Sequence, residues 1–296
     1  MTTPTPTGRD APPPAARLLP MALVTWAFIA LVLVLIVALV VVKLTEGNAP
    51  PPPSPAAAPA EAVAAITGLS VQDFDAAAAA GFAPGPTILA GQPALTDGGR
   101  PKVVFVGAEF SPYSAAESWV VVVALVRFGT FSHLGALSSA STEVFAHTPG
   151  FAFDGATYRS PYVSLAAVDL YGQTLSSVAP AGYPPLATLD GTTAGLLQRY
   201  DGPGTDPTLP FVDVDNQLLA VGDAIGVSPG ALAGQSLGQV AGSLGNAARP
   251  GGSAVLAAAD ELTAAVCAGD GWRPSAVCDS AGVRAAAAHL GLPPSG

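Results

Sequence analysis

An uncharged apolar run near the N-terminus constrains the fold of this chain more than any other feature. Residues 18–42 read LLPMALVTWAFIALVLVLIVALVVV, between Arg17 and Lys43. About 20 apolar residues cross the hydrocarbon core of a bilayer, whereas the apolar region of a signal peptide has only about 7–15. The run therefore predicts a transmembrane helix over 18–43, in contact with the lipid bilayer, in preference to a cleaved signal.

Charges on either side of this helix indicate its orientation. Ahead of it, residues 1–17 carry Arg9 and Arg17 but only one acidic residue. After Lys43, the next basic residue is Arg100. Positive charge beside a membrane segment marks the cytoplasmic side. We therefore expect a cytoplasmic tail over 1–17 and a single-pass protein of the cell membrane whose C-terminal part is extracytoplasmic.

A proline- and alanine-rich segment follows the helix. Residues 44–60 include the stretch GNAPPPPSPAAAPA from Gly47, and proline both fixes φ and lacks the N–H that a helix or sheet requires. The segment is typical of a semi-rigid stalk. After residue 46 the chain has 19 acidic and 8 basic residues, a net charge of −11. Such an acidic domain, 61–296, is not expected to bind nucleic acid.

Apolar runs within residues 61–296 alternate between lengths typical of strands and of helices, which predicts an α/β layer. The clearest unit is a strand over Lys102–Val106, a turn, and a helix over Ala115–Phe128. Further strands are expected at Gly135–Ser138, Gly150–Phe153, Val163–Leu170, Pro210–Val214 and Gln217–Val221, the last two forming a hairpin through Asp215–Asn216. Further helices are expected at Ala231–Leu244, Ser253–Cys267 and Ser275–Leu290, and Asp75–Gly81 is expected to form the end of a short helix before the first strand.

Three segments carry a resemblance to a known family. They read VGAEFSPYSAAESWVVVVALVRFGTF from Val106, FDGATYRSPYVSLAAVDLYG from Phe153, and TLPFVDVDNQLLAVGDA from Thr208. Together they resemble the family known as domain of unknown function 929, a membrane-tethered, thioredoxin-like group, over most of residues 61–290. The resemblance implies a thioredoxin-like mixed sheet flanked by helices and preceded by one transmembrane helix.

In that family the turn after the first strand carries a C-P-Y-C motif. Here the turn is Ser111-Pro112-Tyr113-Ser114, so serine occupies both cysteine positions. Thiol–disulfide exchange requires a thiolate, and a serine hydroxyl performs neither redox step. We expect Ser111 and Ser114 to cap the following helix by accepting hydrogen bonds from its free N–H groups.

The resemblance also implies a groove for a peptide. The segment Thr208-Leu209-Pro210-Phe211 is similar to the thioredoxin-fold loop whose proline is cis and faces the motif, so Pro210 is the candidate cis-proline. Such a groove holds an extended peptide through exposed main chain and an apolar floor, and needs no sulfur. Tyr113, Leu209 and Pro210 are expected to form it.

The two cysteines, Cys267 and Cys278, both lie on the expected outer side of the membrane. A disulfide persists outside the cytosol, and closing a loop of this size contributes about 3 kcal/mol of stability. A structural disulfide is the favoured interpretation. A relocated redox pair and free thiols remain alternatives.

Other chemistry receives little support from the sequence. Gly226-Val227-Ser228-Pro229-Gly230 matches the G-x-S-x-G elbow of hydrolases, but Pro229 lacks the N–H that would stabilise an oxyanion. His133, near the serine motif, is a weak candidate base. The histidines have no metal-ligand spacing, and no Walker A or G-x-G-x-x-G motif occurs, so no metal or cofactor is expected. Aromatic residues around Arg159, and Tyr171, either pack or face a partner.

Three hypotheses follow from the sequence. The preferred one is a non-catalytic module that binds an envelope protein or an extended peptide through the groove beside Ser111 and Ser114. The alternative is a thiol–disulfide oxidoreductase that uses Cys267 and Cys278. The third is a tethered spacer without a defined ligand.

Overall fold

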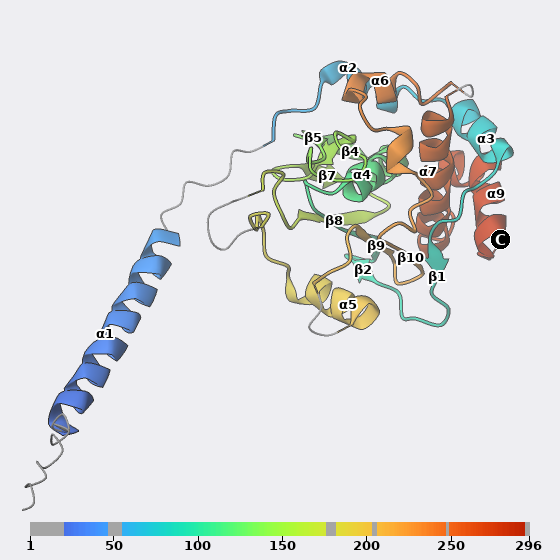
Figure 1. Ribbon diagram of the computed structural model, residues 1–296. Coiled ribbons are helices and arrows are strands. Elements are labelled where there is room, and N and C mark those ends of the chain that lie inside the picture. Colours follow the sequence, from blue (N-terminus) through green and yellow to red (C-terminus); the bar gives the residue numbers. More distant parts are fainter. Residues whose placement is uncertain (1–20, 47–54, 176–181, 203–205, 247–248, 294–296) are drawn as a thin grey trace, which may run out of the picture. The chain divides into compact units, whose positions relative to one another are not determined.

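The computed structural model describes residues 21–46, 55–175, 182–202, 206–246 and 249–293, without the side chains of residues 21–24 and 42–46 (Figure 1). The chain divides into two units, Met1–Pro51 and Pro52–Gly296. The expected tail over 1–17 and residues 18–20 of the expected membrane helix lie outside the described residues.

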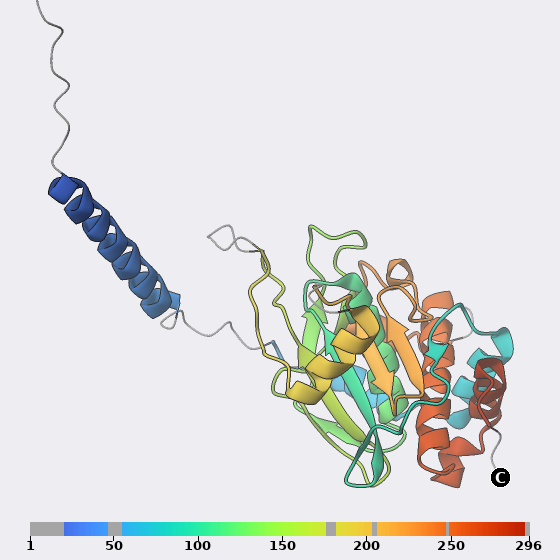
Figure 2. The same cartoon turned by 90° about the horizontal axis from the view of Figure 1, so that it is seen from below.

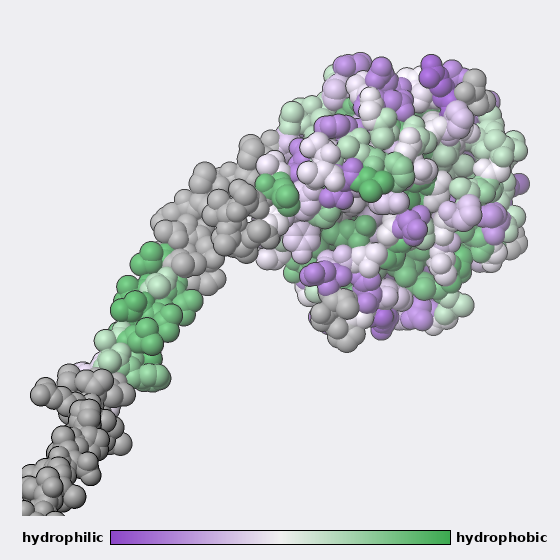
Figure 3. Space-filling view, in the orientation of Figure 1, coloured by the Kyte–Doolittle hydropathy of each residue, from purple (hydrophilic) through white to green (hydrophobic). Residues whose placement is uncertain are grey.

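Helix α1 (Met21–Glu46) is the described part of the first unit. Its apolar side chains are exposed, with Trp26 at 69% and Phe28 at 67% of their possible surface. Figure 3 shows this apolar surface in green. The stretch whose side chains are described, Thr25–Val41, is shorter than a full membrane span. Among the described helices, Pro250–Gly269 is long and apolar enough for a span, but 78% of its apolar window is buried inside the fold.

A mixed sheet lies at the centre of the second unit. Its described strands follow the order β1-β10-β9-β3-β2, and β8 also pairs with β3. Only the β3–β8 pair is parallel. The strands span Thr87–Ile88 (β1), Thr96–Asp97 (β2), Arg100–Gly107 (β3), Ser164–Asp169 (β8), Phe211–Val214 (β9) and Leu218–Val221 (β10). The structure thus confirms the mixed α/β class and the β9–β10 hairpin.

Helices and two small two-stranded sheets surround the central sheet. The small sheets pair β4 (Thr130–Ser132) with β7 (Thr157–Arg159) and β5 (Gly135–Ser138) with β6 (Pro149–Ala152). The helices are α2 (Ala60–Thr67), α3 (Val71–Ala80), α4 (Pro112–Leu125), α5 (Gly191–Asp201), the 3-10 turn η1 (Pro229–Ala231), α6 (Leu237–Ala241), α7 (Pro250–Gly269), α8 (Ser275–Cys278) and α9 (Ala281–Leu290).

The side chains of β3 alternate between two apolar layers, as a strand with two covered faces requires. Val103 and Phe105 belong to the large core that includes α4 and α7. Val104 and Val106 belong to a smaller core that includes Leu196 and Leu197 of α5. Figure 2 shows α5, in gold, against the strands. The sheet is therefore the middle of three layers.

The valine-rich segment folds as helix α4 because both of its ends and its surroundings favour a helix. Ser111 is the N-cap and Pro112 occupies the first turn, where its missing N–H costs nothing. Every residue from Ser114 to Leu125 is buried. Trp119, which is fully buried, donates from Nε1 to the Pro149 carbonyl at 2.8 Å. Burial in the core outweighs the modest helix propensity of valine.

Two expected helices are wrong in extent. The segment Ala231–Leu244 forms only the end of η1 and the short α6, because Gly234 has φ +74° and Ser236 begins a new capping box. Ser275–Leu290 is broken into α8 and α9, with Ser280 as the second N-cap. The expected strand at Lys102–Val106 is confirmed with shifted ends. Asp75–Gly81 is confirmed as the end of a helix, since α3 ends at Ala80 and Gly81 is its C-cap.

The end of the expected stalk is joined to the folded unit. Ala58 N–H donates to the Leu134 carbonyl at 2.8 Å, and Ala57 forms a β-bridge with Gly135. These residues extend the edge of strand β5. Residues 47–54 of the expected stalk lie outside the described residues.

Candidate functional site

The serine turn sits between the C-terminal end of β3 and the start of α4. Ser111 Oγ accepts a hydrogen bond from Ser114 N–H at 3.2 Å, the capping role expected from the sequence. Ser114 Oγ accepts from Ala108 N–H at 3.1 Å, so it holds the turn rather than the helix end. Ser111 is 6% exposed and Ser114 only 1%. Within the described residues, no hydrogen bond joins either hydroxyl to a histidine or a carboxylate.

The loop before β9 lies across a hollow from this turn. The Leu209–Pro210 peptide bond is cis. Ser111 and Leu209 both line a hollow of about 360 Å³, whereas Pro210 itself is buried behind it. The main-chain N–H and C=O of Leu209 take part in none of the hydrogen bonds among the described residues. The hollow is therefore lined by an apolar residue whose main-chain groups form no hydrogen bond with the rest of the described chain.

Aromatic rings form a large part of the wall of this hollow. Phe110, Tyr171 and Tyr183 all line it, together with Asp206 and Pro207. The Phe110 and Tyr183 rings stack with centroids 3.9 Å apart, and the Phe110 and Tyr171 centroids are 6.3 Å apart. All three rings are half-buried. We call these residues, with Ser111 and Leu209, the aromatic hollow.

Tyr113 contributes to a different hollow on its side of the turn. That second hollow, of about 300 Å³, is also lined by Phe145, Asp223 and Gly226. The rings of Tyr113 and Phe145 pack edge to face with their centroids 6.3 Å apart, and Phe145 has φ +63°. The structure therefore does not bring Tyr113, Leu209 and Pro210 together in one groove. Leu209 and Tyr113 lie on separate sides of the serine turn.

Two carboxylates lie next to the turn, of which Glu109 is half-buried and Asp169 is buried. Burial, and then the charges of Asp169 and Asp154, raises the pKa of Glu109 to about 7. Burial also raises the pKa of Asp169 to about 6, although its carboxylate accepts a hydrogen bond from Phe153 N–H at 2.7 Å. Near neutral pH, Glu109 thus carries only part of a negative charge. No group of three or more possible metal ligands occurs among the described residues.

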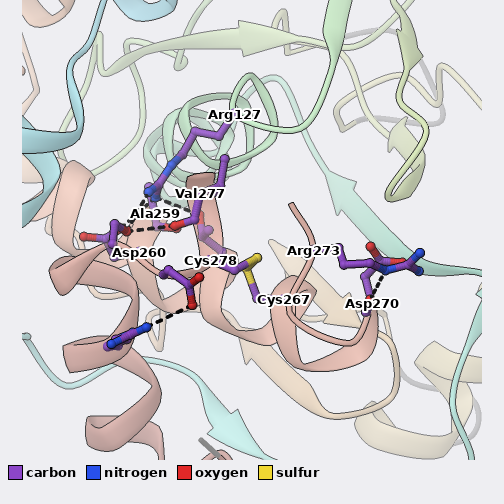
Figure 4. The surroundings of a disulfide bond; sticks show 12 residues. Arg127, Ala259, Asp260, Cys267, Asp270, Arg273, Val277 and Cys278 are labelled. Atoms are coloured by element: carbon purple, nitrogen blue, oxygen red, sulfur yellow. Dashed lines mark hydrogen bonds and ion pairs between the residues drawn. A yellow bond between two sulfur atoms is a disulfide. The ribbon is translucent and has the colours of Figure 1, made fainter. Parts of the chain in front are cut away.

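The disulfide belongs to the C-terminal helices and not to the serine turn. Cys267, near the end of α7, is bonded to Cys278 of α8, and neither residue is exposed to solvent. Figure 4 shows it at the centre of the view, with Asp270 and Arg273 to its right. Neither cysteine begins a helix, so neither has the position that lowers a thiol pKa. This arrangement supports the structural interpretation of the pair.

We expect this disulfide to resist reduction because both sulfur atoms are buried. Alkylation and intact-mass analysis of the full chain across glutathione potentials should show an oxidised pair to below about −300 mV. The free energy of unfolding of the C267S/C278S variant should be about 3 kcal/mol lower, because the loop between two positions 11 residues apart is no longer cross-linked. A midpoint between about −120 and −230 mV would instead favour the oxidoreductase hypothesis.

Other candidate groups are held in local structure. Asp260 and His289 follow Ser228 in the chain order of a hydrolase triad. In the structure, however, Asp260 pairs with Arg127 and His289 lies 3.6 Å from Glu261. Tyr158 donates to the Leu125 carbonyl at 2.8 Å and packs in the core. Each of these side chains thus has a contact within the fold that explains its position without a catalytic role.

Comparison with known families identifies part of the chain. Residues 89–179 match the family described as Domain of unknown function (DUF929). The chain carries a DUF929 segment. This DUF929 match includes β3, the serine turn, α4 and β8, but ends before the Leu209 loop and both cysteines. No curated protein and no solved structure matches the chain.

The DUF929 segment contains two aromatic residues of the hollow: Tyr171, which the sequence suggested either packs or faces a partner, and Phe110, which the sequence analysis did not single out. Phe110 directly precedes the serine turn, and Tyr171 follows β8. Both lie at the carboxyl ends of neighbouring parallel strands, where ligands of α/β sheets gather. That rule could have identified them. Tyr183 and Asp206 carry no such signal, because only the folded loops bring them to the same hollow.

Proposed function

We propose that the chain is a membrane-anchored, extracytoplasmic, thioredoxin-like module that binds an extended polypeptide segment without redox chemistry. The observation that carries the proposal is the aromatic hollow between the serine turn and the Leu209 loop. Its lining includes aromatic rings and Leu209, whose main-chain groups form no hydrogen bond among the described residues. An extended peptide requires both features, because its main chain forms hydrogen bonds and its side chains enter pockets.

The thioredoxin-like part of the proposal is supported by the order of the elements. A strand leads through the serine turn into α4, a parallel strand follows, and a cis X–Pro loop precedes the β9–β10 hairpin and α7. Helices cover both faces of the sheet. In this arrangement the serine turn and the Leu209 loop meet at one edge, where a redox motif would meet its substrate.

The absence of redox chemistry is inferred from the serines and the buried disulfide. Ser111 and Ser114 use their oxygens to hold the turn. Cys267 and Cys278 are inaccessible to a substrate thiol as long as the fold is intact. No cofactor is needed for the proposed binding.

Binding can be tested with the full chain in lipid nanodiscs and a pool of acetylated random heptapeptides. We expect Leu209→Glu, which places a charge in the hollow, to reduce peptide retention at least about tenfold, or about 1.4 kcal/mol. Val71→Glu, at an exposed apolar position of α3, is the matched control and should retain peptide like the parent. Pro207→Trp is a second test of the same hollow, in case Leu209→Glu does not fold. Its large side chain should fill the hollow from the rim and reduce peptide retention as well. Equal retention by all three variants would contradict the proposal.

The membrane anchor and its orientation can be tested by cysteine labelling. The native cysteines are bonded to each other, so an added cysteine is the one reactive thiol. In intact cells, a membrane-impermeant maleimide should label Asp223→Cys but not Thr7→Cys, which should react after permeabilisation. The proposal is supported by the exposed apolar surface of α1, whose burial in lipid is favourable. If intact cells label Thr7→Cys but not Asp223→Cys, the protein has the opposite orientation in the membrane, and the proposed orientation is wrong.

A further inference from the structure

The charges around the aromatic hollow, as well as its rings, determine which chemical groups it can bind. Asp206 lines it, is exposed, and has no ion-pair partner among the residues that the structure describes. Glu143 adjoins it, since Tyr183 OH donates to Glu143 Oε1 at 2.8 Å. No lysine or arginine lines the hollow. Its charges are therefore all negative.

The rings add an attraction for cations. Phe110, Tyr171 and Tyr183 are each half-buried and so keep part of their surface toward the hollow. The face of an aromatic ring attracts a cation within about 6 Å of its centre. A ring wall beside a free carboxylate is thus suited to a group that carries both methylene carbons and a positive charge.

We propose that the aromatic hollow accepts a lysine or arginine side chain of the bound peptide. The inference rests on the proposed function and names the partner chemistry of the same site. The methylene groups pack on the Phe110–Tyr183 stack and on Leu209, and the cationic end lies beside Asp206. The acidic charge of the whole region after residue 46, net −11, attracts such a basic segment over longer distances.

The basic side chain is chosen over a purely apolar one because of Asp206. An apolar side chain in the hollow would partly desolvate this carboxylate and offer it no partner, whereas a cation satisfies it. An acidic side chain would be repelled by both Asp206 and Glu143. The expected order of preference is therefore basic, then apolar, then acidic.

The test uses full-length protein in nanodiscs and heptapeptide pools whose central residue is lysine, arginine, norleucine or glutamate, with random flanks. We expect the lysine and arginine pools to be retained about fivefold more than the norleucine pool in 50 mM salt, and the difference to shrink in 500 mM salt. Norleucine keeps the length of lysine without its charge.

Variants identify the groups responsible. Asp206→Asn should bring the basic pools close to norleucine, whereas Asp223→Asn, an equal charge change in the second hollow, should not. Tyr183→Leu should reduce retention of the basic pools more than that of norleucine. Equal retention of all pools, lost in Leu209→Glu, would overturn this inference and leave the proposed function intact. Retention of no pool would overturn both.

Discussion

Replacing Arg127 by methionine is expected to destabilise the fold strongly, because it breaks a buried ion pair. Arg127 donates to Asp260 Oδ1 at 2.7 Å, and the two side chains are only 8% and 0% exposed (Figure 4). The guanidinium carbon also lies 4.1 Å from the centre of the Phe74 ring. Methionine keeps the apolar stem but leaves the Asp260 carboxylate buried without a cation. We expect a loss of about 3 kcal/mol at pH 8.

This loss should depend on pH in a defined direction. Burial raises the pKa of Asp260 to about 6, even though Arg127 lowers it. Such a group lowers stability as pH rises from its unfolded pKa through its folded pKa, because the folded state must either retain a proton or bury a charge. Removing Arg127 raises the folded pKa further and extends the decline to higher pH. At pH 5 the carboxyl group is largely protonated in both proteins, so the difference should shrink to about 1 kcal/mol.

Urea unfolding of the full chain in detergent micelles at pH 5 and pH 8 measures both values. Arg284→Met is the matched control, because its partner Asp279 is 45% exposed and Arg284 itself 58% exposed. An exposed pair contributes less than about 1 kcal/mol. A loss for Arg127→Met that is independent of pH, or no larger than the control, would show that the buried pair does not stabilise the fold through its charge.

Replacing both Ser111 and Ser114 by cysteine is expected to create a disulfide exchange activity. Ser111 and Ser114 lie at the N-cap and third positions of α4, where the helix dipole stabilises a thiolate. The adjacent hollow would hold the peptide that carries the disulfide. The S111C/S114C variant should therefore form a disulfide and reduce a peptide disulfide in the presence of a dithiol.

The N-terminus of another helix, α3, serves as a control. It separates the effect of the hollow on the exchange rate from the effect of the helix dipole. Ser70 and Asp73 occupy the same N-cap and third positions of α3, and no described hollow is lined by either. S70C/D73C should react with peptide disulfides about tenfold more slowly, equivalent to about 1.4 kcal/mol of lost binding. If S111C/S114C folds, as judged by circular dichroism, but exchanges no faster than this control, the hollow does not bind peptides productively.

Turns and helix ends could be predicted from the sequence, because they depend on residues that are adjacent in the chain. The hairpin through Asp215 and Asn216 is an example, since both residues have φ +55° and both types tolerate that conformation. Ser111 followed by Pro112 likewise identifies the start of α4. The segment Ala231–Leu244 was misjudged, because its apolar composition suits a helix while Gly234 and Ser236 end one turn and begin another.

The hollow could be predicted only in part. Leu209 and the serine turn were expected to lie together, and both line it. Tyr113 was placed on the wrong side, because successive residues of a helical turn point in different directions. Tyr183 and Asp206 reach the hollow from the loops before and after α5. Their positions depend on how α5 and the loops around it pack, which no local pattern encodes.

The sequence by itself determined the apolar N-terminal helix, the alternation of strands and helices, the serine turn without thiols, and the two cysteines that could pair. Each depends on the character of neighbouring residues or on simple counting. Only the tertiary structure decided which carboxylates are buried, that the disulfide is inaccessible, and that three rings and Asp206 share one hollow. These features arise from contacts between distant segments, where burial changes the chemistry of a side chain according to what packs around it.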